Sequence, residues 1–197
     1  MDYPHFLGPS NVSASPFFDQ ERTVNFILER AESPGATTRW MLTSTPGVTV
    51  LATGTTGAGR AHYFDVQTNR EFAVQGTAFV EISSTNTITS RGTVAVDSNP
   101  ATIVGNGDGG GQLLVTSGTN AYVFTLATNV LASIAALAGK ATMGDMLDGF
   151  GIVLDSATSK VYVSSLLNFA TWDTADFIQR NKAPDPLVSI RVATGYL

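Results

Sequence analysis

The stretch 71-EFAVQGTAFVEIS-83 decides the fold of this chain. Two short runs rich in apolar residues flank the pair Gly76-Thr77. Alternation of apolar and polar residues with a period of two is typical of half-buried strands, and a short turn that contains glycine joins antiparallel strands. The stretch therefore predicts a β-hairpin.

The same pattern recurs twice further along the chain. The segments 116-TSGTNAYV-123 and 155-DSATSKVYV-163 align with 74-VQGTAFV-80, and their aromatic residues, Phe79, Tyr122 and Tyr162, are 43 and 40 residues apart. Each unit has room for four short strands. A repeat of about 40–50 residues with four strands is typical of a propeller blade. We predict an all-β protein made of β-propeller-like blades of short antiparallel strands. The alternative is a β-sandwich whose hairpins merely look alike.

Apolar runs bounded by turn residues continue over most of the chain after Trp40. We expect further strands at residues 48–53, 61–66, 87–94, 101–106, 112–117, 121–128, 130–135, 150–155, 160–165 and 187–192, the last as the first strand of a next unit. We divide the chain into an N-terminal arm with the first strand, residues 1–39, and a blade-like β domain of about three units, residues 40–197. Propellers have about four to eight blades. We therefore expect an incomplete ring, which a longer chain or other subunits would close.

Two segments do not follow the simple strand pattern. Residues 17–30 fit either an amphipathic helix or a long strand, and the alternation of their apolar residues favours the strand. In residues 169–186 we predict the end of a strand followed by one helical turn. Asp173 would cap that turn, with Asp176 in it, and Trp172 and Phe177 would both be buried between two sheet units.

Composition excludes several classes of function. Charged residues make up only 14% of the 197 residues, the net charge is −5, and 25 Thr and 16 Ser stand against 3 Lys. Because phosphate contacts need clustered Lys and Arg, a freely diffusing nucleic-acid binder is disfavoured. There is no cysteine, which excludes disulfides, thiolate metal sites and cysteine nucleophiles. No apolar run approaches the roughly 20 residues that span a membrane.

No residue pattern predicts catalysis, and we expect neither a cofactor nor a metal. Of the two histidines, His5 lies near the terminus and His62 is expected to be a half-buried structural residue. The run 105-GNGDGGGQ-112 matches the spacing of a dinucleotide loop, but a strand rather than a helix is expected after it. We interpret this run as a flexible hairpin tip.

Acidic and aromatic residues near the C-terminal end allow a second hypothesis. Asp145, Asp148 and Asp155 lie in 144-GDMLDGFGIVLD-155, and Trp172 with Phe169 and Phe177 is able to form a sugar platform. These residues would suit a carbohydrate-binding or glycan-hydrolysing propeller module. We favour a structural role: Asp148-Gly149 as a hairpin turn, and the aromatic residues as a plug between sheets.

The order of small motifs resembles that of the packaged-DNA stabilisation proteins, or tail accessory factors, of short-tailed phages. An R-x-x-N-x-x-x-E opening precedes a TPG strand, and later a W-D-x-x-D-F segment precedes a P-D-x-x-V strand. The residues that carry these motifs are Arg22, Asn25, Glu29, Thr45, Pro46, Gly47, Ser165, Leu166, Trp172, Asp173, Asp176, Phe177 and Asp185.

The resemblance implies a non-enzymatic structural virion protein. Members of the family are head-completion, or head–tail connector, proteins with a β-propeller that close the portal and retain the packaged DNA. The implied partners are the portal or adaptor ring and other tail proteins, with several copies in a symmetric assembly close to the DNA and no membrane. The implied location is the virion, after assembly in the host cytoplasm. The motif residues above are expected to serve the structure.

Overall fold

The computed structural model describes residues 26–30, 32, 35, 40–47, 49–50, 54–180 and 185–193. The chain divides into two compact units, Met1–Val50 and Leu51–Leu197. In the first unit, β1 (Phe26–Arg30) pairs antiparallel with β2 (Trp40–Ser44). The described end of the ambiguous segment 17–30 is therefore a strand. Our division into an arm and a β domain stays a prediction.

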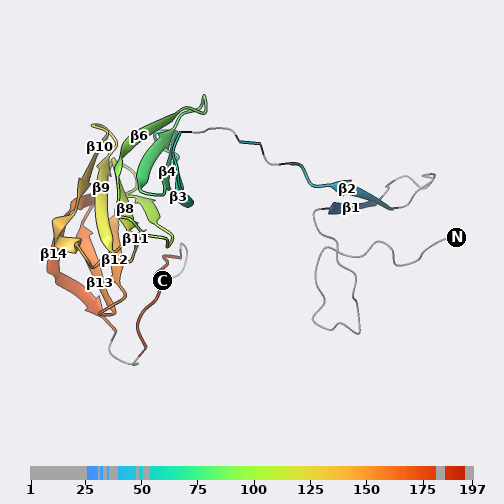
Figure 1. Cartoon of the computed structure of the whole chain (residues 1–197). Helices are drawn as coiled ribbons and strands as arrows, with labels where there is room; N and C mark the ends of the chain where they lie inside the picture. Colours follow the sequence, from blue (N-terminus) through green and yellow to red (C-terminus); the bar gives the residue numbers. More distant parts are fainter. Residues whose placement is uncertain are drawn as a thin grey trace. The chain divides into compact units, whose positions relative to one another are not determined.

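The second unit consists of three antiparallel sheets of four strands each, which we call blades 1, 2 and 3 (Figure 1). In every blade the strand order follows the sequence, so each blade is a meander. Blade 1 contains β3 (Gly59–Asp65), β4 (Arg70–Gln75), β5 (Ala78–Ile82) and β6 (Ile88–Thr93). Blade 2 contains β7 (Thr102–Gly105), β8 (Gln112–Ser117), β9 (Asn120–Thr125) and β10 (Val130–Ser133). Blade 3 contains β11 (Met143–Leu147), β12 (Phe150–Asp155), β13 (Lys160–Ser165) and β14 (Asn168–Gln179), and a 3-10 turn, η1 (Ala135–Leu137), precedes it.

This arrangement confirms the all-β, propeller-like prediction and the repeat on which it depends. The three aligned segments each form the second strand, the turn and the third strand of one blade: β4–β5, β8–β9 and β12–β13. The repeat is visible in the sequence because the turn between the second and third strands requires particular residue types in each blade, such as glycine in blades 1 and 2. Asp148 and Gly149 have φ values of 50° and 84°, as in a type I′ turn, which confirms the predicted hairpin there.

A second kind of turn contains an aspartate followed three residues later by a threonine. In the turn between β12 and β13, the Asp155 carboxylate accepts a hydrogen bond from the Ala157 N–H (3.1 Å) and one from the Thr158 hydroxyl (2.6 Å). Asp65 and Thr68 form the same pair in the turn between β3 and β4. These bonds satisfy polar groups of the turn and fix where each strand ends.

The core lies between the blades rather than inside any one of them. Phe72 and Phe79 of blade 1 pack against Phe124 of blade 2, with ring centroids 5.3 and 5.1 Å from the Phe124 ring. On its other face blade 2 buries Leu114 against Val153 and other residues of blade 3. Blade 2 is therefore buried on both faces, which explains the unbroken apolar run in 112-QLLVTS-117.

Three predictions about strands and turns were wrong. A strand was predicted at residues 48–53, but residues 49–50 belong to no strand. The other residues of that range lie outside the described part of the chain. Residues 187–192 have no regular secondary structure and belong to no sheet. The helical turn expected after Trp172 is absent, because β14 runs through the whole segment Asn168–Gln179.

Candidate functional site

The most irregular part of blade 3 is a bulge in β14. Tyr162 pairs with Phe177 and Ser164 pairs with Trp172, so four residues of β14, 173–176, lie opposite the single residue Val163 of β13. Extra residues in one strand bend it and turn its side chains in new directions. The bulge is the structural reason why the W-D-x-x-D-F segment does not alternate like a simple strand.

Trp172 fixes one end of this bulge in the core. Its side chain is only 9% exposed, and its indole Nε1–H donates a hydrogen bond to the carbonyl oxygen of Phe169 at 2.6 Å. Phe169 itself is fully buried. The predicted burial of Trp172 is confirmed, and its one polar atom is satisfied there.

The residues after Trp172 are exposed, which corrects the remaining predictions for this segment. The Asp173 carboxylate accepts a hydrogen bond from the Ala175 N–H at 2.9 Å, so it stabilises the bulge and does not cap a helix. Phe177 is 40% exposed and packs at the surface between Tyr162 and Lys160, whose Nζ lies 4.0 Å from the Phe177 ring centroid. Trp172 and Phe177 therefore do not share one core.

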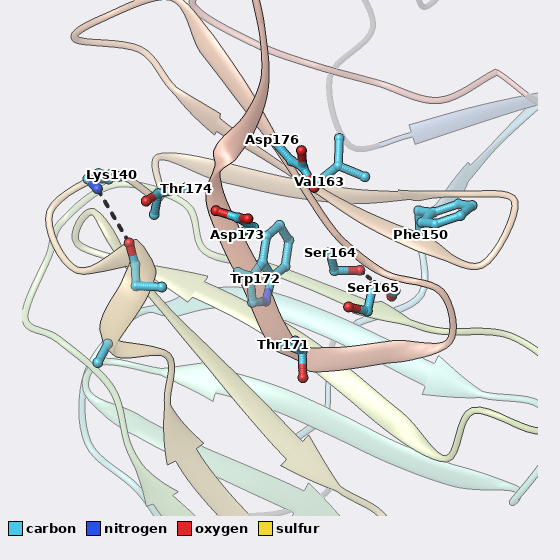
Figure 2. A pocket seen from close by; sticks show the side chains of 12 residues that line it. Lys140, Phe150, Val163, Ser164, Ser165, Thr171, Trp172, Asp173, Thr174 and Asp176 are labelled. Carbon is cyan, nitrogen blue, oxygen red and sulfur yellow. Dashed lines mark hydrogen bonds between the residues drawn. The ribbon is translucent and has the colours of Figure 1, made fainter.

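An open cavity of about 790 Å³ lies beside the bulge (Figure 2). Hydroxyl and carboxylate groups dominate its lining, together with one cation. The polar lining residues are Ser164, Ser165, Thr171, Asp173, Thr174, Asp176 and Lys140. Such a surface suits hydrogen bonds with the main chain or side chains of a partner protein.

The residues proposed for a sugar platform do not come together. Phe169 is inaccessible and Trp172 nearly so, which leaves little ring surface for stacking. Asp145 lines a different cavity, where its carboxylate accepts hydrogen bonds from the N–H groups of Met146 (2.9 Å) and Val192 (2.8 Å). Asp148 lies in the type I′ turn described above. The geometry therefore gives no support to the carbohydrate hypothesis.

That second cavity, of about 600 Å³, follows the first strands of the three blades. Residues of β3, β7 and β11 line it, and residues 189–191 of the C-terminal segment line it as well. His62 lies in this lining and is exposed, with its Nε2 2.7 Å from the Glu71 carboxylate. The expectation of a half-buried His62 was wrong, and its contact with Glu71 lies at the surface.

Polar side chains connect the blades, and the sequence analysis missed them. Glu81 pairs with Arg70 and Arg91 at 2.6 and 2.7 Å, and the hydrogen bonds from Arg70 are the main reason why the pKa of the Glu81 carboxyl is lowered. Arg70 also donates to the main-chain oxygen of Leu126 in blade 2 at 2.9 Å. The signal available in the sequence was basic residues close to an acidic one on neighbouring strands of one blade: Glu81 pairs with Phe72, so Arg70 lies two positions away on the adjacent strand.

Blades 2 and 3 have a corresponding polar connection. The side chain of Asn106 donates to the main-chain oxygen of Leu167 at 2.9 Å, and the Gln112 side-chain oxygen accepts from the Phe169 N–H at 2.7 Å. Asn106 and Gln112 flank the glycine-rich run, which joins β7 to β8 as predicted. The run forms the loop of this hairpin, since a strand and not a helix follows it; its flexibility stays a prediction.

The remaining motif residues that the structure describes are exposed. Glu29 lies in β1, Pro46 and Gly47 follow β2, and Asp185 begins the C-terminal described segment. Arg22 and Asn25 lie outside the described residues, as does His5. The structural roles that the resemblance implies for these residues stay predictions.

Two kinds of feature are absent from the described residues. Within them, no group of three or more His, Asp or Glu side chains is arranged to hold a metal ion. The same part of the chain has no helix with the length and apolar character needed to cross a membrane.

Comparison with known protein families agrees with this architecture. Residues 6–197 match the family described as Bacteriophage P22 Gp10, beta-propeller. The chain belongs to this phage stabilisation family. No curated protein matches the chain. Family membership confirms the resemblance seen in the motif order and identifies a structural protein of the phage virion with a stabilising role. A structural family of this kind points to a protein without catalytic activity.

Proposed function

We propose that the protein acts at the junction of the phage head and tail, where it closes the portal and helps to retain the packaged DNA. Membership of the Gp10 β-propeller family over residues 6–197 is the observation that carries this proposal. Stacked blades suit such a role, because each exposes loops at both ends of its strands while the faces between neighbouring blades remain packed.

The surface chemistry supports a protein that binds other proteins rather than DNA. The chain carries a net charge of −5 with only 3 Lys, so its lateral surface repels a polyanion. The cavity beside the β14 bulge offers hydroxyls, two carboxylates and one ammonium group, a mixture suited to polar contacts between subunits. We infer that its partners are the portal or adaptor ring and other tail proteins, in a symmetric assembly of several copies that forms in the host cytoplasm.

The proposal is tested by deleting the gene in the phage and purifying the particles. We expect heads that package DNA and then lose it, measured as the ratio of full to empty heads in electron micrographs. The purified chain, added to such heads, should restore full particles, and cryo-electron microscopy should show it below the portal. Heads that retain their DNA without the protein would refute the proposed role.

A further inference from the structure

The glycine-rich loop between β7 and β8 contains a pair of residues that is prone to a chemical modification. Asn106 is followed by Gly107, and no other asparagine among the 197 residues precedes a glycine. Because glycine has no side chain, the main-chain nitrogen of residue 107 is open to approach. In such a pair this nitrogen is able to attack the amide carbon of the asparagine side chain. The sequence therefore has one position that favours deamidation.

Deamidation at this position needs only the chain and water. The Gly107 nitrogen forms a bond with Cγ of Asn106 and gives up its proton, and the side-chain nitrogen Nδ2 takes up that proton and leaves as ammonia. Water then opens the five-membered imide at one of its two carbonyl groups. The product is aspartate or, where the main chain now runs through the side chain, isoaspartate. Either product has a carboxylate in place of a neutral amide.

The folded chain holds the Asn106 amide at the junction of blades 2 and 3. The residue is 1% exposed. Its Oδ1 accepts a hydrogen bond from the Gln112 N–H at 2.9 Å, and its Nδ2 donates one to the main-chain oxygen of Leu167 at 2.9 Å. Gly110 leaves the space for this amide, since a Cβ there would overlap its atoms. The imide cannot form without breaking the bond to Leu167, because Nδ2 is the leaving group.

The bond from Asn106 supports a strained turn of blade 3. Leu167 has a φ of 51°, a conformation that a leucine rarely adopts. Its N–H donates to the main-chain oxygen of Gly149 at 2.8 Å, and its own oxygen accepts from Asn106. Such strain persists where the surrounding contacts hold the backbone in place. Loss of Nδ2 therefore frees the turn that connects β13 to β14.

An aspartate at position 106 is not able to restore this contact. A carboxylate accepts hydrogen bonds and has no proton to donate when it is ionised, so the Leu167 oxygen would face a negative charge. The side-chain oxygen of Gln112, which lies 3.5 Å from Nδ2, would be a second acceptor beside it. Burial of a charge among acceptors is strongly unfavourable. The junction therefore stays open around the product.

We propose that Asn106 is the deamidation site of this protein and that its conversion to aspartate or isoaspartate disconnects blades 2 and 3 irreversibly. The reaction takes place in molecules whose loop has opened, because the folded junction holds the amide in its hydrogen bonds. Each reacted molecule fails to close again, so the reaction limits the lifetime of the folded chain. The inference does not depend on the proposed function, since it concerns only this junction.

Peptide mass spectrometry of the whole purified chain measures the reaction. The chain is incubated in mildly alkaline buffer, which favours loss of the Gly107 proton, once folded and once unfolded in urea. The fragment that contains Asn106 is then assayed for replacement of the amide by an acid and for isoaspartate. We expect Asn106 to react before every other asparagine in the unfolded chain, and to react about tenfold or more slowly in the folded one.

Two variants with the same chemical change separate a donor role from an acceptor role. Asn106→Asp has the side chain of the product and should melt roughly 5–10 °C below the unmodified chain. Its amides at Leu167 and Phe169 should exchange faster. Asn129→Asp is the matched control, because the Asn129 side-chain oxygen accepts a hydrogen bond from Arg70 and an aspartate keeps that acceptor. The control should melt no lower than the unmodified chain.

Three results would overturn the proposal. The first is an equal rate of deamidation in the folded and the unfolded chain, which would mean that the junction does not protect the amide. The second is another asparagine that reacts before Asn106 in the unfolded chain. The third is a melting temperature of Asn106→Asp within about 2 °C of that of Asn129→Asp. If Asn106→Asp does not fold, the two rates in the unmodified chain still decide the question.

Discussion

Replacing Trp172 by alanine tests the packing between blades 2 and 3. The side chain is 9% exposed and lies in the cluster with Leu114, Val153 and Phe169, and its indole N–H bonds to the Phe169 carbonyl oxygen. Truncating a buried tryptophan costs about 3–5 kcal/mol. For a domain of this size about 1 kcal/mol lowers the melting temperature by roughly 2–4 °C, so we expect a fall of about 6–20 °C.

The measurement is thermal and urea unfolding, followed by far-UV circular dichroism. Tryptophan fluorescence is not suitable, because without Trp172 the remaining tryptophan, Trp40, lies in the other unit. Trp172→Phe separates the two contributions: it keeps most of the apolar contact but leaves the Phe169 carbonyl unpaired, which costs about 1–3 kcal/mol. Phe177→Ala is the matched control at the surface end of the same bulge, and it should cost less than the Trp172 variants. If Trp172→Ala melts within 2 °C of the unmodified chain, on the same scale of roughly 2–4 °C per kcal/mol, the assignment of Trp172 to the core is wrong.

Three further changes have outcomes fixed by single contacts. The lowered pKa of Glu81 means that its ion pairs stabilise the fold above the ordinary carboxyl pKa of 4.5 and that this contribution is lost as the pH falls below it. Between pH 7 and pH 3 the urea midpoint of the unmodified chain should therefore fall more than that of Glu81→Gln; equal falls would contradict the pairing. Gly105→Ala places a methyl group 2.5 Å from the Tyr63 hydroxyl and should lower the free energy of unfolding by about 1–3 kcal/mol. Adding Tyr63→Phe removes that hydroxyl and should recover most of this loss, as measured by calorimetry. Thr119 has a φ of 63°, which is strained for a β-branched residue, so Thr119→Gly should stabilise the fold by up to about 1–2 kcal/mol. The control Thr77→Gly, at a turn position without positive φ, should not stabilise it. The reverse order of melting temperatures would refute this.

Local sequence determined the blades, because their hairpins obey short-range rules. Asp148-Gly149 strongly favours a type I′ turn by its own backbone preferences. In the turns after Asp65 and Asp155, the aspartate bonds to the threonine three residues later. Alternation then assigns each side chain to one face of its strand. The repeat and the motif order were therefore readable from the sequence, and with them the fold and the family.

Tertiary structure alone decided the features that depend on a neighbouring blade. Trp172 and Phe177 look equivalent in the sequence, but the bulge at residues 173–176 places one in the core and the other at the surface. Residues 187–192 have a strand pattern and yet join no sheet, because main-chain hydrogen bonding requires a second strand and the described residues place none beside them. Pairing partners and burial arise from segments distant in the sequence, so local propensity cannot specify them.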